Sequence, residues 1–194
     1  MHKRFIIKEL NMIKNYESSL KEIIKEYNLK PKKRLGQNFL HDKNIISSII
    51  RKAKVENENI IEIGPGPGIL TKNILKEKAK SLLVIEKDKS FKANLKKIKN
   101  DYQENFDYLI CDILDFDFNQ LTKNAFKVIS NLPYNISVPF ILKMVKNQKI
   151  IPWKEMILMV QKEVAERIVA RRGTKRYGRL SLMVNLNNNV TKIL

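Results

Sequence analysis

Residues Ile60–Gly68 read IIEIGPGPG, a short run that is apolar except for Glu62 and is followed by glycines at every second position. The apolar run predicts a buried strand. The glycines let the backbone turn sharply and come close to a ligand, because no side chain intervenes. A plain turn between a strand and a helix would also fit. Since the spacing is G-x-G-x-G and not the dinucleotide fingerprint G-x-G-x-x-G, the turn favours a nucleotide-like ligand and argues against NAD.

Similar apolar runs recur along the chain and alternate with helical patterns. Phe91, Leu95 and Ile98 show the spacing of three and four that is typical of a covering helix. Strands buried on both faces read as continuous apolar runs, so this alternation predicts an α/β fold with a doubly wound, mostly parallel sheet. Such sheets bind ligands at the carboxyl ends of their strands. The predicted strands are Ile60–Ile63, Leu82–Ile85, Tyr108–Cys111, Lys127–Ser130 and Met156–Val160.

Size and charge narrow the class of protein. The chain has 194 residues, of which 43% are hydrophobic, enough for one domain with a substantial core. Lysine and arginine number 38 against 20 acidic residues, which gives a formal net charge of +18. A surplus of this size suits a polyanionic partner, with nucleic acid as the first candidate. Genome composition also produces lysine-rich surfaces, so the charge needs support from specific motifs.

Cysteine and histidine are scarce. The single cysteine, Cys111, can form no disulfide within the chain, which favours a reducing compartment. With only His2 and His41 in addition, no Cys/His metal cluster can be built. No apolar run approaches membrane-spanning length, and the basic start lacks the apolar core of a signal peptide. The sequence therefore predicts a soluble, cytoplasmic protein without metal or membrane partner, which we expect to be a monomer.

The start of the chain reads as an appendage to the main domain. Apolar residues recur at spacings of three and four from Ile13 to Tyr27 and predict an amphipathic helix. The basic run Lys30–Arg34 follows it and breaks the pattern. We therefore assign residues 1–32 to an N-terminal helical extension with a basic linker, and residues 33–194 to the main domain.

Acidic residues end the second and third predicted strands. Glu86 ends the second strand, where a carboxylate would accept hydrogen bonds from two ribose hydroxyls. NAD and S-adenosylmethionine both carry such a ribose. Asp112 ends the third strand and could accept a hydrogen bond from an adenine amino group. Each acid could instead be a solvated helix cap, but consecutive strands that end in ligand-type residues favour a binding site.

The fourth predicted strand runs into Ser130–Ser137, which reads SNLPYNIS. The exocyclic amine of adenine is a poor nucleophile, because its lone pair is delocalised into the ring. The side-chain oxygen of Asn131 and a backbone carbonyl near Leu132 could hold its two hydrogens and leave the lone pair aimed at an electrophile. Pro133 would fix the loop, and Tyr134 would offer a face on which a flipped base stacks. A bland turn would also use Asn and Pro.

These motifs together resemble the ribosomal RNA adenine dimethyltransferases of the small-subunit type. The resemblance runs from about Lys33 to the last residue. The motifs that carry it are Gly36–Asp42 (GQNFLHD), the Gly64 loop, Glu86, Asp112, Asn131–Ser137 (NLPYNIS), Gln161–Ala165 (QKEVA) and Tyr177–Ser181 (YGRLS).

The resemblance implies a Rossmann-like class I methyltransferase fold and S-adenosylmethionine as methyl donor. In this family the reaction is dimethylation of the 6-amino groups of two adjacent adenosines in a hairpin near the 3′ end of small-subunit rRNA. The expected partner is therefore small-subunit rRNA or the pre-small ribosomal subunit. The catalytic residues would be Asn131, Leu132, Pro133 and Tyr134, and the cofactor residues Asn38, Leu40, Gly64, Gly66, Glu86, Asp112 and Asn131.

Two departures from the family pattern stand out. Pro67 replaces the usual leucine and stiffens the cofactor loop. The family also normally continues beyond the position of Leu194 with a further strand and a small helical domain. We therefore expect a domain truncated before its final strand, with an unpaired sheet edge and weak rRNA selectivity.

A basic group lies beside the YGRLS motif. Arg171, Arg172, Lys175, Arg176 and Arg179 occupy nine positions without an acid. Such a group could be only a solvated surface, but its place beside a family motif favours contact with rRNA phosphates.

Two other functions stay open at this point. A large-subunit rRNA adenine methyltransferase of the macrolide-resistance type would share the architecture. A non-catalytic nucleic-acid binder, such as a transcription or ribosome-assembly factor, could also use this fold. The intact Asn131–Tyr134 motif argues for retained chemistry.

Overall fold

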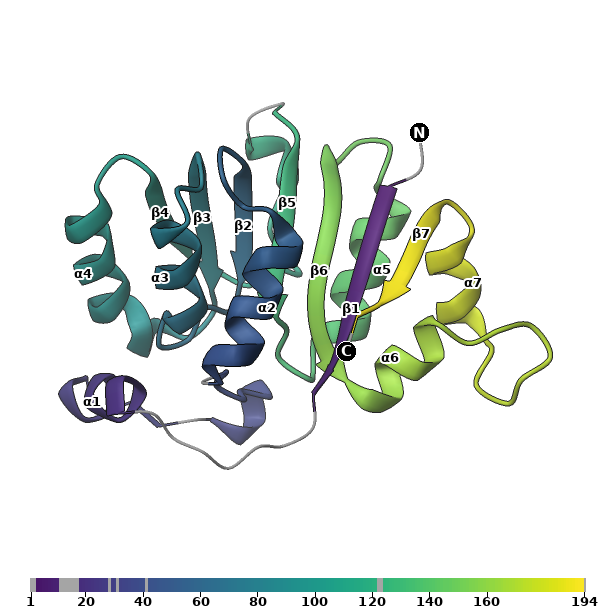
Figure 1. Cartoon of the computed structure of the whole chain (residues 1–194), viewed down its shortest axis with the longest axis horizontal. Helices are drawn as coiled ribbons and strands as arrows, with labels where there is room; N and C mark the ends of the chain where they lie inside the picture. Colours follow the sequence, from purple (N-terminus) through teal and green to yellow (C-terminus); the bar gives the residue numbers. More distant parts are fainter. Residues whose placement is uncertain are drawn as a thin grey trace.

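The computed structural model describes residues 3–10, 18–27, 29–30, 32–40, 42–121 and 124–193. Within this part of the chain, strands β1 to β7 form one sheet in the order β4-β3-β2-β5-β6-β1-β7 (Figure 1). Each strand is parallel to its neighbours. The strands are β1 (Lys3–Leu10), β2 (Asn59–Ile63), β3 (Ser81–Glu86), β4 (Phe106–Ile110), β5 (Phe126–Asn131), β6 (Trp153–Gln161) and β7 (Asn188–Lys192). The α-helices are α1 (Ser18–Glu26), α2 (Lys43–Ala53), α3 (Ile69–Lys76), α4 (Lys92–Tyr102), α5 (Ser137–Lys146), α6 (Lys162–Ile168) and α7 (Arg179–Asn185).

The prediction of a doubly wound parallel sheet is confirmed. Strands β2 to β6 form at the five predicted apolar runs. Their crossover connections place the carboxyl ends of β2, β3, β4 and β5 along one edge, where ligand-binding residues were expected. The segment Gln161–Glu163 joins β6 to α6.

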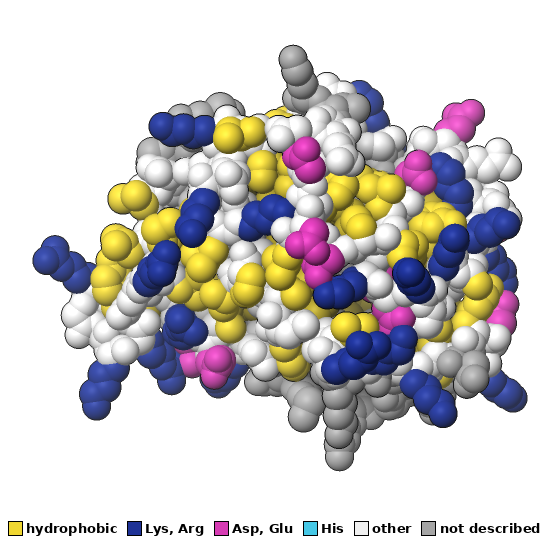
Figure 2. All heavy atoms as spheres, turned by 180° about the vertical axis from the view of Figure 1, so that it is seen from behind, with side chains coloured by type: hydrophobic (Ala, Val, Ile, Leu, Met, Phe, Trp, Pro, Cys, Tyr) yellow, Lys and Arg dark blue, Asp and Glu magenta, His cyan; other side chains and the backbone are white. Residues whose placement is uncertain are grey.

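Helices cover both faces of the sheet (Figure 1). On one face, Ile49 of α2, Ile74 of α3 and Leu95 of α4 are fully buried in one apolar cluster. On the other face, Phe140 of α5 and Val184 of α7 belong to a second cluster. Figure 2 shows this second face, with hydrophobic side chains across its centre and lysine and arginine side chains around them. Among the described residues, no helix is long and apolar enough to cross a membrane.

The first strand departs from the sequence prediction. Residues 1–32 were assigned to a helical extension, but Lys3–Leu10 is a strand that lies between β6 and β7. Arg4 to Leu10 pair with Glu155 to Gln161 of β6, and Lys3 to Ile7 pair with Asn188 to Lys192 of β7, so β1 joins these two strands. Backbone N–H and C=O groups at the side of a strand need hydrogen-bond partners, and β1 provides them for both β6 and β7.

The predicted N-terminal helix is described in part. It is described as α1, Ser18–Glu26, and residues 13–17 lie outside the described part of the chain. Ile23 of α1 is buried in the same apolar cluster as α4, and Glu26 forms an ion pair with Lys97 at 3.1 Å. The division at residue 32 stays a prediction.

A buried lysine lies near the amino-terminal ends of the strands, opposite the predicted site. Lys127, near the start of β5, donates to the carbonyl oxygens of Ala53 (2.6 Å) and Lys54 (3.1 Å) at the end of α2. Its ammonium also lies 3.2 Å from the carboxylate of Glu58 and 3.5 Å from that of Glu155. The charge is therefore compensated although it is buried, and it fixes α2 against the strands.

Candidate functional site

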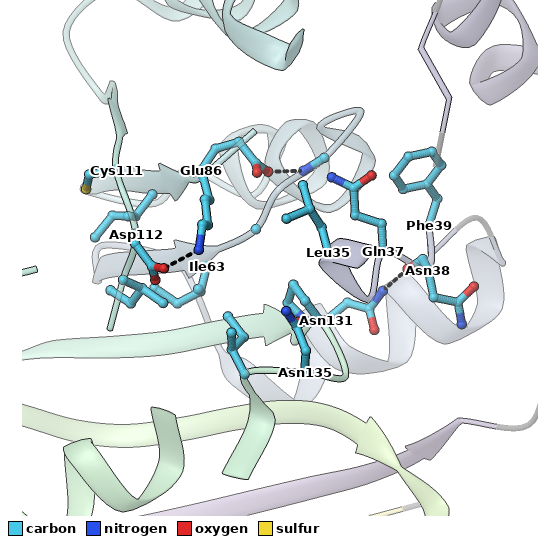
Figure 3. A pocket seen from close by; sticks show the side chains of 17 residues that line it. Leu35, Gln37, Asn38, Phe39, Ile63, Glu86, Cys111, Asp112, Asn131 and Asn135 are labelled. Atoms are coloured by element: carbon cyan, nitrogen blue, oxygen red, sulfur yellow. Dashed lines mark hydrogen bonds and ion pairs between the residues drawn. The ribbon is translucent and has the colours of Figure 1, made fainter. Parts of the chain in front are cut away.

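A cleft of about 600 Å³, including its opening to solvent, lies at the carboxyl ends of β2 to β5 (Figure 3). The end of each strand contributes to its wall: Ile63 and Gly64 at β2, Glu86 and Lys87 at β3, Cys111, Asp112 and Ile113 at β4, and Asn131 and Pro133 at β5. Leu35, Gln37, Asn38 and Phe39, which precede α2, line the opposite side. The fold therefore gathers the predicted strand-end residues around one cleft.

The glycine turn after β2 approaches the loop after β5. Gly64 has φ +62°, a conformation that favours glycine, and a Cβ there would lie 3.1 Å from Cγ of Pro133. A Cβ on Gly66 would lie 3.3 Å from the ring of Phe39. Any side chain at these two positions would therefore press into the walls of the cleft.

Glu86 is buried at the end of β3 and is anchored to the glycine turn (Figure 3). Its carboxylate accepts hydrogen bonds from the backbone N–H groups of Gly66 (3.2 Å) and Asp88 (2.8 Å). Burial raises the pKa of Glu86, and these two donors act against that shift. The side chain thus has a fixed orientation at the cleft wall.

Asp112 combines a turn contact with a charged one. One carboxylate oxygen accepts from the backbone N–H of Leu114 (2.9 Å), within a turn and not at the start of a helix. The other lies 2.5 Å from the ammonium of Lys87 (Figure 3). Burial alone would raise the pKa of Asp112, but the Lys87 ammonium and the Leu114 N–H hold it below its usual value. Lys87 is a cleft residue that the sequence analysis missed, although it stands between Glu86 and Asp88.

The loop after β5 holds a buried hydrogen-bond acceptor beside the cleft. The Nδ2 group of Asn131 donates to the backbone carbonyl of Asn38 at 2.6 Å (Figure 3). Its Oδ1 atom is buried and accepts no hydrogen bond from any described residue. Buried polar atoms normally have a partner, so this oxygen indicates a place where a ligand donates.

The other three residues of the predicted catalytic motif have different surroundings. Leu132 is buried at 1% exposure with its side chain in the core, so only its main chain can take part in the site. Pro133 lines the cleft. Tyr134 is half-buried and does not line the cleft, but its hydroxyl oxygen accepts a hydrogen bond from Nδ2 of Asn38 at 2.8 Å.

Leu40 lies in a smaller neighbouring cavity of about 300 Å³. This cavity shares Asn38, Gly64 and Asn131 with the main cleft and is also lined by Glu62. Glu62 is buried and accepts a hydrogen bond from the Thr71 hydroxyl at 2.7 Å. Burial raises its pKa to about 8, so this carboxyl is largely protonated at neutral pH.

Residues 32–40, which we name the N-terminal strap, are fastened to both sides of the cleft. On the β3 side, the Asp88 carboxylate lies 2.6 Å from the Lys32 ammonium and accepts from Nε2 of Gln37 at 3.1 Å. On the β5 side, the backbone N–H of Tyr134 donates to the Gly36 carbonyl at 3.3 Å. The strap thereby forms a wall of the cleft with fixed ends.

Lys143 holds the loop that follows β4. Its ammonium, on α5, donates to the carbonyl oxygens of Ile113 (3.2 Å), Leu114 (2.7 Å) and Phe116 (2.7 Å). It also lies 5.5 Å from the ring centre of Phe118. No sequence pattern indicated this residue, because its partners are backbone atoms about 30 positions away.

The predicted RNA-binding residues lie apart from the cleft. Residues 171–179 are all exposed, and 171–178 lie in the loop between α6 and α7, which projects from the molecule (Figure 1). Arg176 forms an ion pair with Glu166, whereas Arg179 begins α7. Among the described residues, no group of three His, Cys, Asp or Glu side chains could hold a metal ion.

The fold is that of methyltransferases. A dimethyladenosine transferase from Plasmodium falciparum superposes with a TM-score of 0.66 at 31% identity, covering 77% of this chain and 52% of that one. The 23S rRNA methyltransferase ErmE superposes with a TM-score of 0.59 at 23% identity, covering 75% of this chain and 56% of that one. This second likeness shows a common fold and nothing more.

Within this fold, residues 28–194 match the family model described as ribosomal RNA adenine dimethylase, and the chain belongs to that family. "Ribosomal RNA small subunit methyltransferase A" of Wolbachia sp. subsp. Drosophila simulans (strain wRi) is 44% identical over 170 residues, which are 87% of this chain and 62% of the relative. The protein of the same name from Alkaliphilus oremlandii (strain OhILAs) is 43% identical over 175 residues, 87% of this chain and 60% of the relative. The predicted family is thus confirmed, and the chain spans about 60% of the length of these relatives.

Proposed function

We propose that the protein transfers methyl groups from S-adenosylmethionine to the 6-amino groups of two adjacent adenosines in the 3′-terminal hairpin of small-subunit rRNA. The observation that carries this proposal is the buried, unpartnered Oδ1 atom of Asn131 at the cleft. An acceptor in that position suits an amine that must be held by its hydrogens. Family membership and the names of the curated relatives support the same reaction.

The cleft residues fit the methyl donor. Gly64 and Gly66 leave the space that a Cβ would fill, and Glu86 is a fixed carboxylate suited to ribose hydroxyls. Asp112 would accept a hydrogen bond from the adenine amino group of S-adenosylmethionine. Asn38 and Leu40 would contact the rest of the S-adenosylmethionine molecule. When bound, S-adenosylmethionine supplies an electrophilic methyl group on a sulfonium centre. The chain's own residues have to bind and orient the two reactants and to exclude water from between them.

Two acceptors of the chain would hold the target amine. Oδ1 of Asn131 is the first. For the second we choose the carbonyl of Leu132, because the carbonyl of Pro133 already accepts from the Ser137 hydroxyl at 3.0 Å and from the Ile136 N–H at 3.2 Å. With both hydrogens held, the nitrogen lone pair faces the cleft, while the ring of Tyr134 stacks on the base.

The projecting loop would contact the rRNA backbone. Arg171, Arg172, Lys175, Arg176 and Arg179 are exposed and lie within nine positions, and phosphate contacts of this kind fix register without reading sequence. We place this activity in the cytoplasm, where small subunits mature, and the monomeric state stays a prediction.

The test is methyl transfer from labelled S-adenosylmethionine to unmethylated small ribosomal subunits. The wild-type protein should label two adjacent adenosines, and Asn131→Ala should lower the rate about 100-fold, the order expected for loss of one essential polar contact at a reacting group. Asn119→Ala is the matched control, since Asn119 is exposed and does not line the cleft.

Label on large-subunit rRNA alone would instead support the macrolide-resistance type of methyltransferase. Binding without any transfer would support the non-catalytic alternative. An Asn131→Ala variant with the wild-type rate would contradict the assignment of the acceptor.

A further inference from the structure

Asn38 touches both functional side chains of the loop after β5. Its backbone carbonyl accepts from Nδ2 of Asn131 at 2.6 Å, and its own Nδ2 donates to the Tyr134 hydroxyl at 2.8 Å. These partners are 93 and 96 positions away in the sequence. One residue of the N-terminal strap therefore joins the acceptor oxygen to the aromatic face.

The first contact sets the orientation of the Asn131 amide. An amide has one donor end and one acceptor end, and the Asn38 carbonyl can only pair with the donor end. If the amide were reversed, its oxygen would face the Asn38 carbonyl oxygen and both would lose a partner. The Asn38 carbonyl therefore keeps the Asn131 oxygen directed to where an amine hydrogen is to be received.

The second contact sets the tilt of the Tyr134 ring. The ring is half-buried, and its hydroxyl is tied to Asn38 while its backbone N–H is tied to the Gly36 carbonyl at 3.3 Å. Gly36 has φ +62°, and a Cβ there would lie 2.9 Å from the Tyr134 nitrogen. Only glycine allows the strap to come so close, so strap and loop form one packed unit.

We propose that Asn38 is a positioning residue for the methyl acceptor: through its carbonyl it orients Asn131, and through its side chain it fixes the stacking face of Tyr134. This role goes beyond contact with the methyl donor, and it rests on the proposed adenine methylation. This role makes the strap part of two binding sites, the one for the methyl donor and the one for the target adenine.

Positioning matters most in the second of two transfers to one amine. The unmodified amine offers two hydrogens, one to each acceptor of the loop. Each transfer breaks the bond between the methyl group and the sulfonium sulfur, leaves S-adenosylhomocysteine, and ends with the release of one amine proton to solvent. After the first transfer a single hydrogen is left, so one acceptor has no partner and hydrogen bonds hold the base less well. Orientation then depends more on stacking against the ring that Asn38 fixes. A loosened ring should therefore slow the second transfer more than the first.

The experiment is a double-mutant cycle with Tyr134→Phe, which keeps the ring and removes the hydroxyl, and Asn38→Ala, which keeps the carbonyl and removes the side-chain donor. Rates, affinity for S-adenosylmethionine and the ratio of monomethyl to dimethyl adenine are measured. We expect each single variant to raise the monomethyl share about fivefold, and the double variant to add little, because both changes remove the same contact. Tyr134→Phe should leave the affinity for S-adenosylmethionine unchanged.

Tyr102→Phe is the matched control, since this half-buried tyrosine on α4 lies outside the cleft. Thermal unfolding verifies that each variant is folded. An active wild type whose product ratio does not change in Tyr134→Phe, or a cycle with additive effects, would overturn the positioning role alone. A wild type that methylates no adenine would overturn the proposed function, and the positioning role with it.

Discussion

Glu62 is the most perturbed acid described in the molecule. Its carboxyl lies fully buried at the end of β2, with a hydrogen bond from Thr71. Burial, and to a smaller extent the nearby Glu86 carboxylate, raise the pKa to about 8 from an ordinary value of 4.5. Between about pH 4.5 and about pH 8, the folded protein therefore holds a proton here that the unfolded chain releases.

The consequence is a stability that falls as pH rises. Because the folded pKa is raised, the stabilisation is complete below about pH 4.5 and is lost as the pH passes through about 8. Glu62→Gln keeps the acceptor for Thr71 and cannot ionise. We expect its free energy of unfolding to exceed that of the wild type by up to about 4 kcal/mol at pH 9, with a much smaller difference at pH 5.

Chemical denaturation at several pH values between 5 and 9 measures this difference. Parallel pH profiles for the two proteins would show that Glu62 is ionised in the folded state.

The residues that were predictable share one property. Asn131, Glu86 and Asp112 directly follow apolar strands, so position along the sequence was enough to bring them to one edge. Lys143 and the pairing of Asp88 with Lys32 were not predictable, because they depend on which backbone atoms and charges meet in three dimensions. Leu132 was predicted to act through a backbone carbonyl, and its side chain packs in the core.

At the scale of elements, one carboxylate holds the N-terminal strap on the β3 side of the cleft. Asp88 is buried, accepts from Lys32, Gln37 and Ser90, and has its pKa lowered to about 2 although burial alone would raise it. A depressed pKa means that the stabilisation is present above the ordinary value of 3.8 and is lost as the pH falls through about 2.

Asp88→Asn removes this charge with little change of shape. We expect it to lower the free energy of unfolding by about 2 kcal/mol at pH 6, and the difference from the wild type to shrink between pH 4 and pH 2. Because the strap lines the cleft, the variant should also bind S-adenosylmethionine several-fold more weakly, as measured by calorimetry. Asp101→Asn, on the exposed side of α4, is the control. Unchanged affinity would show that the strap keeps its place without this pair.

The strands differ in how far the sequence predicts them. Strands β2 to β6 are apolar runs flanked by turns, and their own residues indicate them. Residues 3–10 read KRFIIKEL, a mixed run that is compatible with several structures. Its partners are β6 and β7, about 150 and 185 positions away, so its identity as a strand depends on pairing and not on local pattern.

At the scale of the whole molecule, the charge of +18 should make RNA binding strongly salt-dependent. Replacing Arg171, Arg172 and Lys175 by alanine should reduce the slope of log affinity against log salt by about 2, at about 0.7 per single-strand phosphate contact. Fluorescence anisotropy with a labelled hairpin RNA measures the slope. Alanine at the exposed Lys52, Lys76 and Lys80 of the α2 and α3 side is the matched control, and equal effects of the two triple variants would indicate a diffuse electrostatic field.

The position of β1 has a consequence for the order in which the protein folds. Arg4 pairs with Glu155, so β1 finds its place only after some 150 further residues have been made. Strands β2 to β5 and their helices can assemble during that time from contacts that are nearer in sequence. Because long-range pairing is entropically costly and slow, insertion of β1 between β6 and β7 should be a late step of folding, when the binding cleft at the other strands has already formed.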